Sequence, residues 1–104
     1  MSNDKGRTND SAAKVLEVLK ALRGHSLIGL SNGQLAKALG ESPSNINRCL
    51  NTLIAAGLAE KKPSGLFSHS VMMVQIATAH ANEMSRARAK LDELDQRVIA
   101  GSYN

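Results

Sequence analysis

Six polar side chains share one side of a predicted helix over residues 42–57 and could hydrogen-bond nucleic-acid bases. An ordinary solvated helix face carries mostly Lys and Glu, whereas this one carries short amides, hydroxyls and one guanidinium. In the major groove Arg pairs with a guanine edge and Asn with an adenine edge, while Ser can contact a phosphate or a base. The pattern predicts a DNA-recognition helix whose outer face is Ser44, Asn45, Asn47, Arg48, Asn51 and Thr52.

The ends of this helix are marked by residues that suit helix termini. Ser42 is a good N-cap, Pro43 fits the first helical position, and Gly57 suits a left-handed C-terminal cap. We include Ser42 among the predicted DNA-binding residues. The side opposite the polar face is apolar at spacings of three and four, so it is expected to be buried; its members are Ile46, Cys49, Leu50, Leu53 and Ile54.

A second helix is expected directly before the recognition helix. Ser31 and Gln34 have the spacing of a capping box, and Leu30 and Leu35 occupy the two positions of a hydrophobic staple. Gly40 ends this helix, and only Glu41 separates it from Ser42. Two helices joined by so tight a turn form a helix-turn-helix motif.

The first helix of the chain is expected to be scaffold. Ser11 is the expected N-cap and Gly24 the expected stop. Its apolar stripe is predicted to consist of Ala12, Val15, Leu16, Leu19 and Leu22. The link over residues 26–30 has enough apolar residues for a bridge or a very short strand.

A β-hairpin is predicted after the recognition helix. Residues 58–62 and 66–70 read as strands, and Pro63-Ser64-Gly65 has turn chemistry. Lys61 and Lys62 beside the tip are predicted to contact the DNA backbone, as a wing does. Phe67 is expected to anchor the wing in the core.

Residues 71–99 contain no Pro or Gly and predict one long helix. Apolar residues alternate four and three apart along it, which is the spacing of a coiled-coil seam. In a parallel homodimer, Glu83 would face Arg88 and Lys90 would face Asp95, two attractive pairs. The alternative is that the helix folds back over its own domain. The seam and predicted dimerisation residues are Met73, Ala77, His80, Met84, Ala87, Leu91, Leu94 and Val98.

Three histidines and one cysteine offer little for catalysis. His80 could weaken the dimer when protonated, or it could tune packing and register. His25 and His69 lie far apart and have no ligand partners at metal-binding spacing, and Cys49 falls on a buried face. Gly24, which precedes two further glycines, begins no phosphate-binding loop. We therefore expect no enzyme activity, no metal and no cofactor.

Charge and hydropathy agree with a nucleic-acid partner. The net charge is +4, and all of the excess lies in residues 1–70, which hold nine Lys or Arg and five Asp or Glu. No leader and no apolar run long enough to span a membrane is evident. The protein is expected in the cytoplasm, associated with the nucleoid.

The order of these elements and several residues resemble the DNA-binding domain of IclR-type bacterial transcription regulators. The resemblance covers residues 11–75 and is carried by Leu30-Ser31, Leu35-Ala36, Gly40, Ser44, Arg48, Leu50, Thr52, Leu53 and Gly57, with Ala13-Lys14-Val15-Leu16 similar to the family's first helix. It implies a winged helix-turn-helix whose third helix enters the major groove. Pro43 sits one place later than the family's usual proline. The family's effector-binding domain is absent from this sequence, so no small-molecule effector is expected.

The predicted fold class is mainly α: a winged helix-turn-helix of three helices and a small β-hairpin, followed by a long C-terminal helix. The expected organisation is a tail over 1–10, the DNA-binding domain over 11–70, a dimerisation helix over 71–100 and a tail over 101–104. The predicted function is a homodimeric transcription regulator that binds an inverted-repeat operator in double-stranded DNA. The alternative is a protein-interaction module in a larger regulatory, replication or transposition complex.

Overall fold

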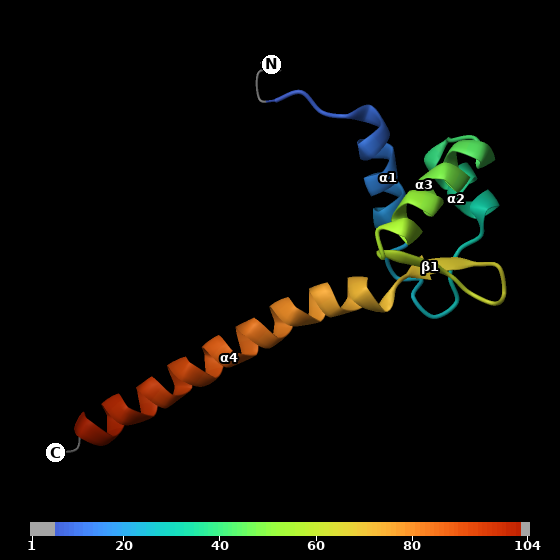
Figure 1. The fold of residues 1–104 in the computed structure, drawn as a ribbon. Helices are drawn as coiled ribbons and strands as arrows, with labels where there is room; N and C mark the ends of the chain where they lie inside the picture. Colours follow the sequence, from blue (N-terminus) through green and yellow to red (C-terminus); the bar gives the residue numbers. More distant parts are fainter. Residues whose placement is uncertain (1–5, 103–104) are drawn as a thin grey trace. The chain divides into compact units, whose positions relative to one another are not determined.

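The computed structural model describes residues 6–102 and divides the chain after Met73 into two compact units. The first unit contains α1 (Asp10–Ala21), α2 (Asn32–Leu39), α3 (Pro43–Ala55), β1 (Ala59–Lys61) and β2 (Phe67–His69), which pack together in Figure 1. The long helix α4 (Val71–Ser102) begins in the first unit and makes up the second. The mainly helical winged fold predicted from the sequence is confirmed.

The predicted tails differ from the observed helix bounds. Residues 1–5 and 103–104, which belong to the two predicted tails, lie outside the described residues. Within the described part, α1 begins at Asp10 and α4 continues through Ser102.

The N-cap of helix α1 lies two residues before the predicted cap. The side-chain Oδ1 of Asn9 accepts a hydrogen bond from the amide of Ala12 at 3.0 Å, so Asn9 and not Ser11 is the N-cap. Asn and Ser are about equally good caps, which is why residue type alone does not choose between them.

The buried stripe of α1 is also rotated from the predicted one. Val18 is 1% exposed and belongs to the core, whereas Leu16 is 54% exposed. Val15, Val18, Leu19 and Leu22 follow the spacing of three and four, and Leu16 lies about 100° around the helix from Val15. Assigning Leu16 to the buried stripe was therefore wrong.

Helix α2 has the predicted capping box. Ser31 Oγ accepts from the amide of Gln34 at 3.0 Å, and Gln34 Oε1 accepts from the amide of Ser31 at 2.8 Å. Gly40 adopts a left-handed φ of 66° at its C-terminal cap, a conformation that glycine tolerates without a Cβ penalty. Leu35 and Ala36 are buried against α3 and α1.

The hairpin pairs its strands in antiparallel register, with Glu60 opposite Ser68. Leu30 adds an isolated bridge to Phe67, so the predicted bridge in the link before α2 is confirmed. The Leu30 amide donates to the Phe67 carbonyl at 2.8 Å, and the Phe67 amide donates back to Leu30 at the same distance. Phe67 is buried, as predicted, and fixes the wing to the core.

Side chains from every element of the first unit except α4 form its core. The core residues are Val18, Leu22, Leu35, Ala36, Ile46, Cys49, Leu50, Leu53, Ala59 and Phe67. The imidazole Nε2 of His69 lies 2.7 Å from the Leu19 carbonyl oxygen, which ties strand β2 to α1. Together these contacts hold α3 between α1 and α2 with one side toward solvent.

Helix α4 starts at a cap that also contacts the end of α3. Ser70 Oγ accepts from the amide of Met73 at 3.2 Å and donates to the Gly57 carbonyl at 2.5 Å. No residue of α4 is buried, and none of the helices in the described part of the chain is long and apolar enough to cross a membrane.

Candidate nucleic-acid interface

The ends of α3 are built as the sequence predicts. Ser42 Oγ accepts from the amide of Asn45 at 3.1 Å, and Pro43 occupies the first helical position. At the other end Gly57 has a left-handed φ of 81°, and the amide of Leu58 donates to the Leu53 carbonyl at 2.9 Å. The helix therefore begins and ends at defined residues, which fixes which side chains face outward.

The two sides of α3 separate as the residue pattern indicates. Ile46, Cys49, Leu50 and Leu53 are buried, while Ile54, assigned to the buried side, is 37% exposed and lies at its edge. Most members of the predicted outer face are exposed: Ser44, Asn47, Arg48, Asn51 and Thr52. The Thr52 hydroxyl donates to the Arg48 carbonyl at 3.0 Å, so it is occupied within the helix.

The helix-turn-helix turn is closed by backbone and side-chain contacts. The side-chain Nδ2 of Asn32 donates to the Pro43 carbonyl at 3.0 Å, and the backbone amide of Glu41 donates to the Ala36 carbonyl at 3.0 Å. The first bond joins the first residue of α2 to the first residue of α3, and the second closes the turn onto α2. They hold the N-terminal turn of α3, where a recognition helix contacts bases, in one position.

Asn45 differs from the freely exposed residue that the sequence suggests. It is half-buried, and its Nδ2 donates to Glu41 Oε1 at 2.7 Å. Glu41 Oε2 in turn lies 3.5 Å from Lys14 Nζ on α1. This hydrogen bond and, after it, the positive charge of Lys14 hold the pKa of Glu41 below its ordinary value despite partial desolvation.

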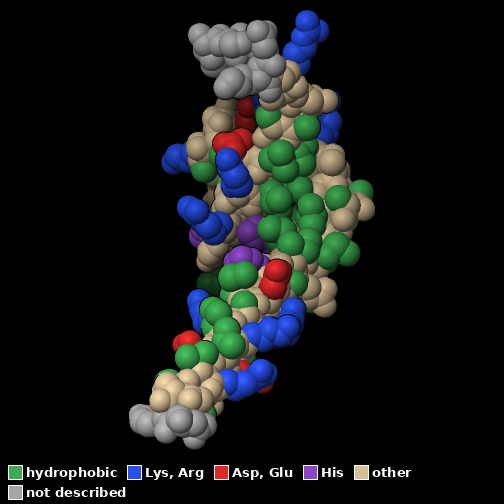
Figure 2. Space-filling model, turned by 90° about the vertical axis from the view of Figure 1, so that its left-hand side faces the viewer, with side chains coloured by type: hydrophobic (Ala, Val, Ile, Leu, Met, Phe, Trp, Pro, Cys, Tyr) green, Lys and Arg blue, Asp and Glu red, His purple; other side chains and the backbone are tan. Residues whose placement is uncertain are grey.

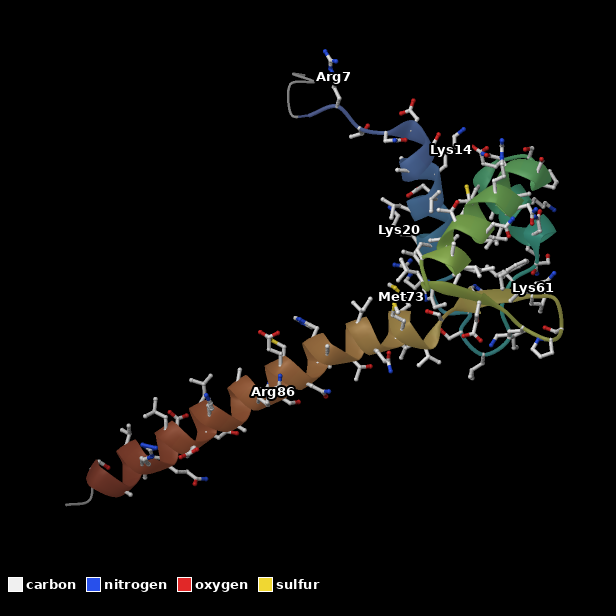
Figure 3. The ribbon with its side chains drawn as sticks, in the orientation of Figure 1. Arg7, Lys14, Lys20, Lys61, Met73 and Arg86 are labelled. Atoms are coloured by element: carbon white, nitrogen blue, oxygen red, sulfur yellow. The ribbon has the colours of Figure 1, made fainter. Side chains whose placement is uncertain are left out.

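An open groove of about 450 Å³ runs between α1 and α3 beside the outer face. Lys14 and Arg48 both line it, and Figure 3 shows Lys14 projecting from the upper part of α1. Two cations beside a groove favour a phosphate. The remaining lining residues are Asp10, Ser11, Val15, Asn45, Cys49 and Thr52.

The sequence analysis missed Lys14 as a candidate site residue. The one sequence feature that pointed to Lys14 was its place on the polar side of the first helix. Only the packing of α1 on α3 places Lys14 in the lining of the same groove as Arg48, and no spacing within α1 indicates this.

Cys49 is one of the residues that line this groove. It is 5% exposed, and burial is the main reason that the pKa of its thiol is raised. A protonated, buried thiol is a packing residue rather than a nucleophile.

The wing presents its lysines unequally. Lys61 is exposed, and its Nζ lies 5.7 Å from the centre of the Phe67 ring, a cation–π distance; Figure 3 labels it on the hairpin. Lys62 is half-buried, and its backbone donates to Leu66 at 2.7 Å to close the turn. Gly65 has a left-handed φ of 88° at the tip.

The predicted seam residues all lie on α4. Met73 is half-buried, and the other seam residues are exposed. Figure 2 shows hydrophobic side chains on the surface of this helix between charged ones. Within the helix, Arg97 and Glu93 form an ion pair at 3.2 Å, one turn apart.

The residues that the structure describes contain no cluster of three His, Cys, Asp or Glu side chains that could hold a metal ion. The candidate functional features of the described chain are the polar face of α3, the basic wing and the groove beside α1.

The three-helix core, the tight α2–α3 turn and the hairpin define a winged helix-turn-helix protein. The model of the IclR helix-turn-helix domain matches residues 11–63, about half of the chain, and the chain belongs to this family. The family is one of DNA-binding domains of transcription regulators. The resemblance inferred from the sequence is thereby confirmed.

One solved structure supports this fold, and a second is reported beside it only for comparison. The crystal structure of HmgR from Pseudomonas aeruginosa is 28% identical with a TM-score of 0.64, over 74% of this chain and 33% of HmgR. The chain thus spans about a third of that protein. ZitR from Lactococcus lactis is 18% identical with a TM-score of 0.44, over 93% of this chain and 66% of ZitR. No curated protein sequence gave a significant match.

Proposed function

We propose that this protein binds specific sequences in double-stranded DNA by placing the outer face of α3 in the major groove. The observation that carries the proposal is that Arg48 and Asn47 are exposed in the first half of α3 and make no side-chain hydrogen bond or ion pair with the described residues. Their donors and acceptors are therefore free for base edges. This role entails a location at the nucleoid in the cytoplasm.

The proposed base contacts follow from side-chain chemistry. Arg48 would contact the O6 and N7 of a guanine, and Asn47 the N6 and N7 of an adenine. Ser44 and Asn51, on the same face, would contact a phosphate or a base. Ser42 uses its oxygen as the helix cap, which leaves its hydroxyl hydrogen to donate to a phosphate.

Basic residues on both sides of α3 support contact with the DNA backbone. Lys61 and Lys62 on the wing would contact phosphates beside the recognition site. Lys14 and Arg48 line the groove on the α1 side, where a second phosphate can lie between two positive charges. Each such contact adds a salt-dependent contribution that is independent of sequence.

We further propose that α4 joins two copies of the chain as a parallel coiled coil. The support is an apolar seam along a helix that buries none of its residues, with Leu91 62%, Leu94 52% and Val98 62% exposed. Glu83 would pair with the partner's Arg88, and Lys90 with the partner's Asp95. Exposed pairs of this kind contribute at most about 1 kcal/mol each and would favour the parallel orientation. Two copies related by two-fold symmetry would bind an inverted repeat.

One observation favours the alternative function, a protein-interaction module. The first turns of α4 are apolar beyond the seam, with Val71 67%, Val74 48% and Ile76 56% exposed. A two-stranded coiled coil would leave part of this surface uncovered. A protein that contacts DNA only incidentally would show no preferred duplex once salt screens the phosphates.

Paired variants test DNA readout. On a preferred duplex at physiological ionic strength, Arg48→Ala should weaken binding by about 1–3 kcal/mol and relax selectivity at one base position. Lys62→Ala should weaken binding to all sequences alike and lower the salt dependence by roughly one phosphate contact. Fluorescence anisotropy over a panel of duplexes with single-base substitutions separates the loss of selectivity at one position from the uniform loss of affinity. Identical behaviour of both variants on every duplex would exclude base readout.

A further inference from the structure

Three residues from separate elements form a connected polar chain at the start of the recognition helix. Glu41 lies in the turn between α2 and α3, Asn45 lies in the first turn of α3, and Lys14 projects from α1. One carboxylate oxygen of Glu41 accepts from Asn45 Nδ2 at 2.7 Å, and the other lies 3.5 Å from Lys14 Nζ. The Glu41 side chain is 26% exposed, so solvent screens these contacts only in part.

This contact fixes which way the Asn45 carboxamide is turned. A free asparagine amide can rotate by 180° and present either its oxygen or its nitrogen to a ligand. An ionised carboxylate can only accept hydrogen bonds, and Glu41, like an ordinary glutamate, is ionised at neutral pH; Asn45 and Lys14 lower its pKa further. The amide nitrogen of Asn45 must therefore face Glu41, and Oδ1 is the atom left to accept from a ligand.

We propose that Glu41 is a positioning residue for base selectivity: by holding the amide nitrogen of Asn45, it commits Asn45 Oδ1 to accept from an exocyclic amino group of a base. This inference rests on the proposed DNA readout. In the major groove adenine N6 and cytosine N4 are donors, whereas guanine O6 and thymine O4 are acceptors. The base facing Asn45 should therefore be adenine or cytosine. The second hydrogen on Nδ2 can reach adenine N7, which places adenine first.

Lys14 supports this arrangement from the opposite side of the carboxylate. Its ammonium lies on α1, so the packing of α1 against α3 contributes to the orientation of Asn45. The three contacting groups are, in order, the Lys14 ammonium, the Glu41 carboxylate and the Asn45 amide nitrogen. Exchanging the charges of residues 14 and 41 should therefore reverse which atom Asn45 presents to DNA.

The test is selection of bound fragments from a random duplex library at physiological ionic strength, with the full chain, three test variants and one control variant. Glu41→Gln replaces the carboxylate by an amide that can donate or accept, so discrimination between amino and keto bases at one position should fall from about 5- to 150-fold to within about twofold. Other positions of the motif should be unchanged. Asn45→Ala should lose preference at that same position.

The charge swap Lys14→Glu with Glu41→Lys gives the sharpest outcome. The ammonium of the new lysine would donate to Asn45 Oδ1, which turns the amide nitrogen outward and makes guanine or thymine the preferred base. The matched control is Glu17→Lys with Lys20→Glu, which reverses an ion pair of 2.8 Å within α1 that does not contact Asn45. This control should retain the wild-type motif.

The outcomes separate the inference from the function on which it rests. An enriched wild-type motif that Glu41→Gln and the charge swap both leave unchanged would overturn the role of Glu41 while DNA readout stands. A wild-type chain that enriches no motif would overturn the proposed function, and this inference with it. A merely structural role for Glu41 would lower the melting temperature without changing which base is preferred.

Discussion

Replacing Gly29 by alanine should detach the wing from the core of the first unit. Gly29 is buried and has a φ of +88°, a conformation that costs an L-residue about 1–2 kcal/mol. An added Cβ would also lie 2.7 Å from the Phe67 carbonyl oxygen and 3.1 Å from Leu66 Cβ. That carbonyl accepts from the Leu30 amide at 2.8 Å, so it cannot retreat without lengthening the hydrogen bond.

The expected magnitude combines two effects. Backbone strain contributes about 1–2 kcal/mol, and loss of the Leu30–Phe67 hydrogen bond contributes about 0.5–1.5 kcal/mol. The total is about 1.5–3.5 kcal/mol, which corresponds to a fall in melting temperature on the order of 6–28 °C for a domain of this size. The assay is urea and thermal unfolding followed by circular dichroism at one protein concentration.

Gly24→Ala is the matched control. Gly24 has nearly the same φ, +83°, but an added Cβ there meets nothing within 4 Å. It should show the strain alone, about 1–2 kcal/mol. If the two variants unfold within about 0.5 kcal/mol of each other, the close contact with Phe67 does not matter and the reasoning about the wing is refuted.

Three further predictions follow from single features. Leu91→Lys in the α4 seam should convert a dimer to a monomer, measured by multi-angle light scattering at micromolar concentration. The control Ala89→Lys, outside the seam, should remain a dimer. A monomeric wild-type chain would contradict the proposed dimer. Gly33→Ala should stabilise α2 by about 0.5–1 kcal/mol in urea unfolding, because its Cβ would meet only Ser31 Oγ at 3.9 Å, and a loss of stability would contradict this. The pKa of Glu41 is lower in the folded chain than in the unfolded chain. The stability that Glu41 contributes is therefore complete above its pKa in the unfolded chain, and it is lost as the pH falls through its pKa in the folded chain. Below about pH 4.3, Glu41→Gln should therefore lose stability less steeply than the wild type, and parallel acid curves would count against the contact.

Local hydrogen-bond chemistry explains why much of the fold could be predicted from the sequence. The capping box of Ser31 and Gln34, the Ser42 cap and the glycine at position 57 each depend on residues within a few positions of one another. Such short-range signals fixed the bounds of α2 and α3. The spacing of apolar residues by three and four predicted which side of α3 faces outward, apart from Ile54 at its edge and the half-buried Asn45.

The remainder depends on contacts between elements that no local pattern specifies. The stripe of α1 could be drawn through Leu16 or Val18, and only packing against α2 and α3 chose Val18. Lys14 reaches Glu41 across the α1–α3 crossing, although the two residues are far apart in the sequence. Asn45 consequently has a partner that its exposed-face pattern did not indicate.

The most direct test of the account is selection from a random duplex library with the wild-type chain and Arg48→Ala at physiological ionic strength. We predict that the wild type enriches an inverted repeat with a guanine in each half-site, and that Arg48→Ala binds the same repeat without a preference for that guanine. Fragments that share no motif, or a motif identical for both proteins, would contradict base readout by the outer face of α3.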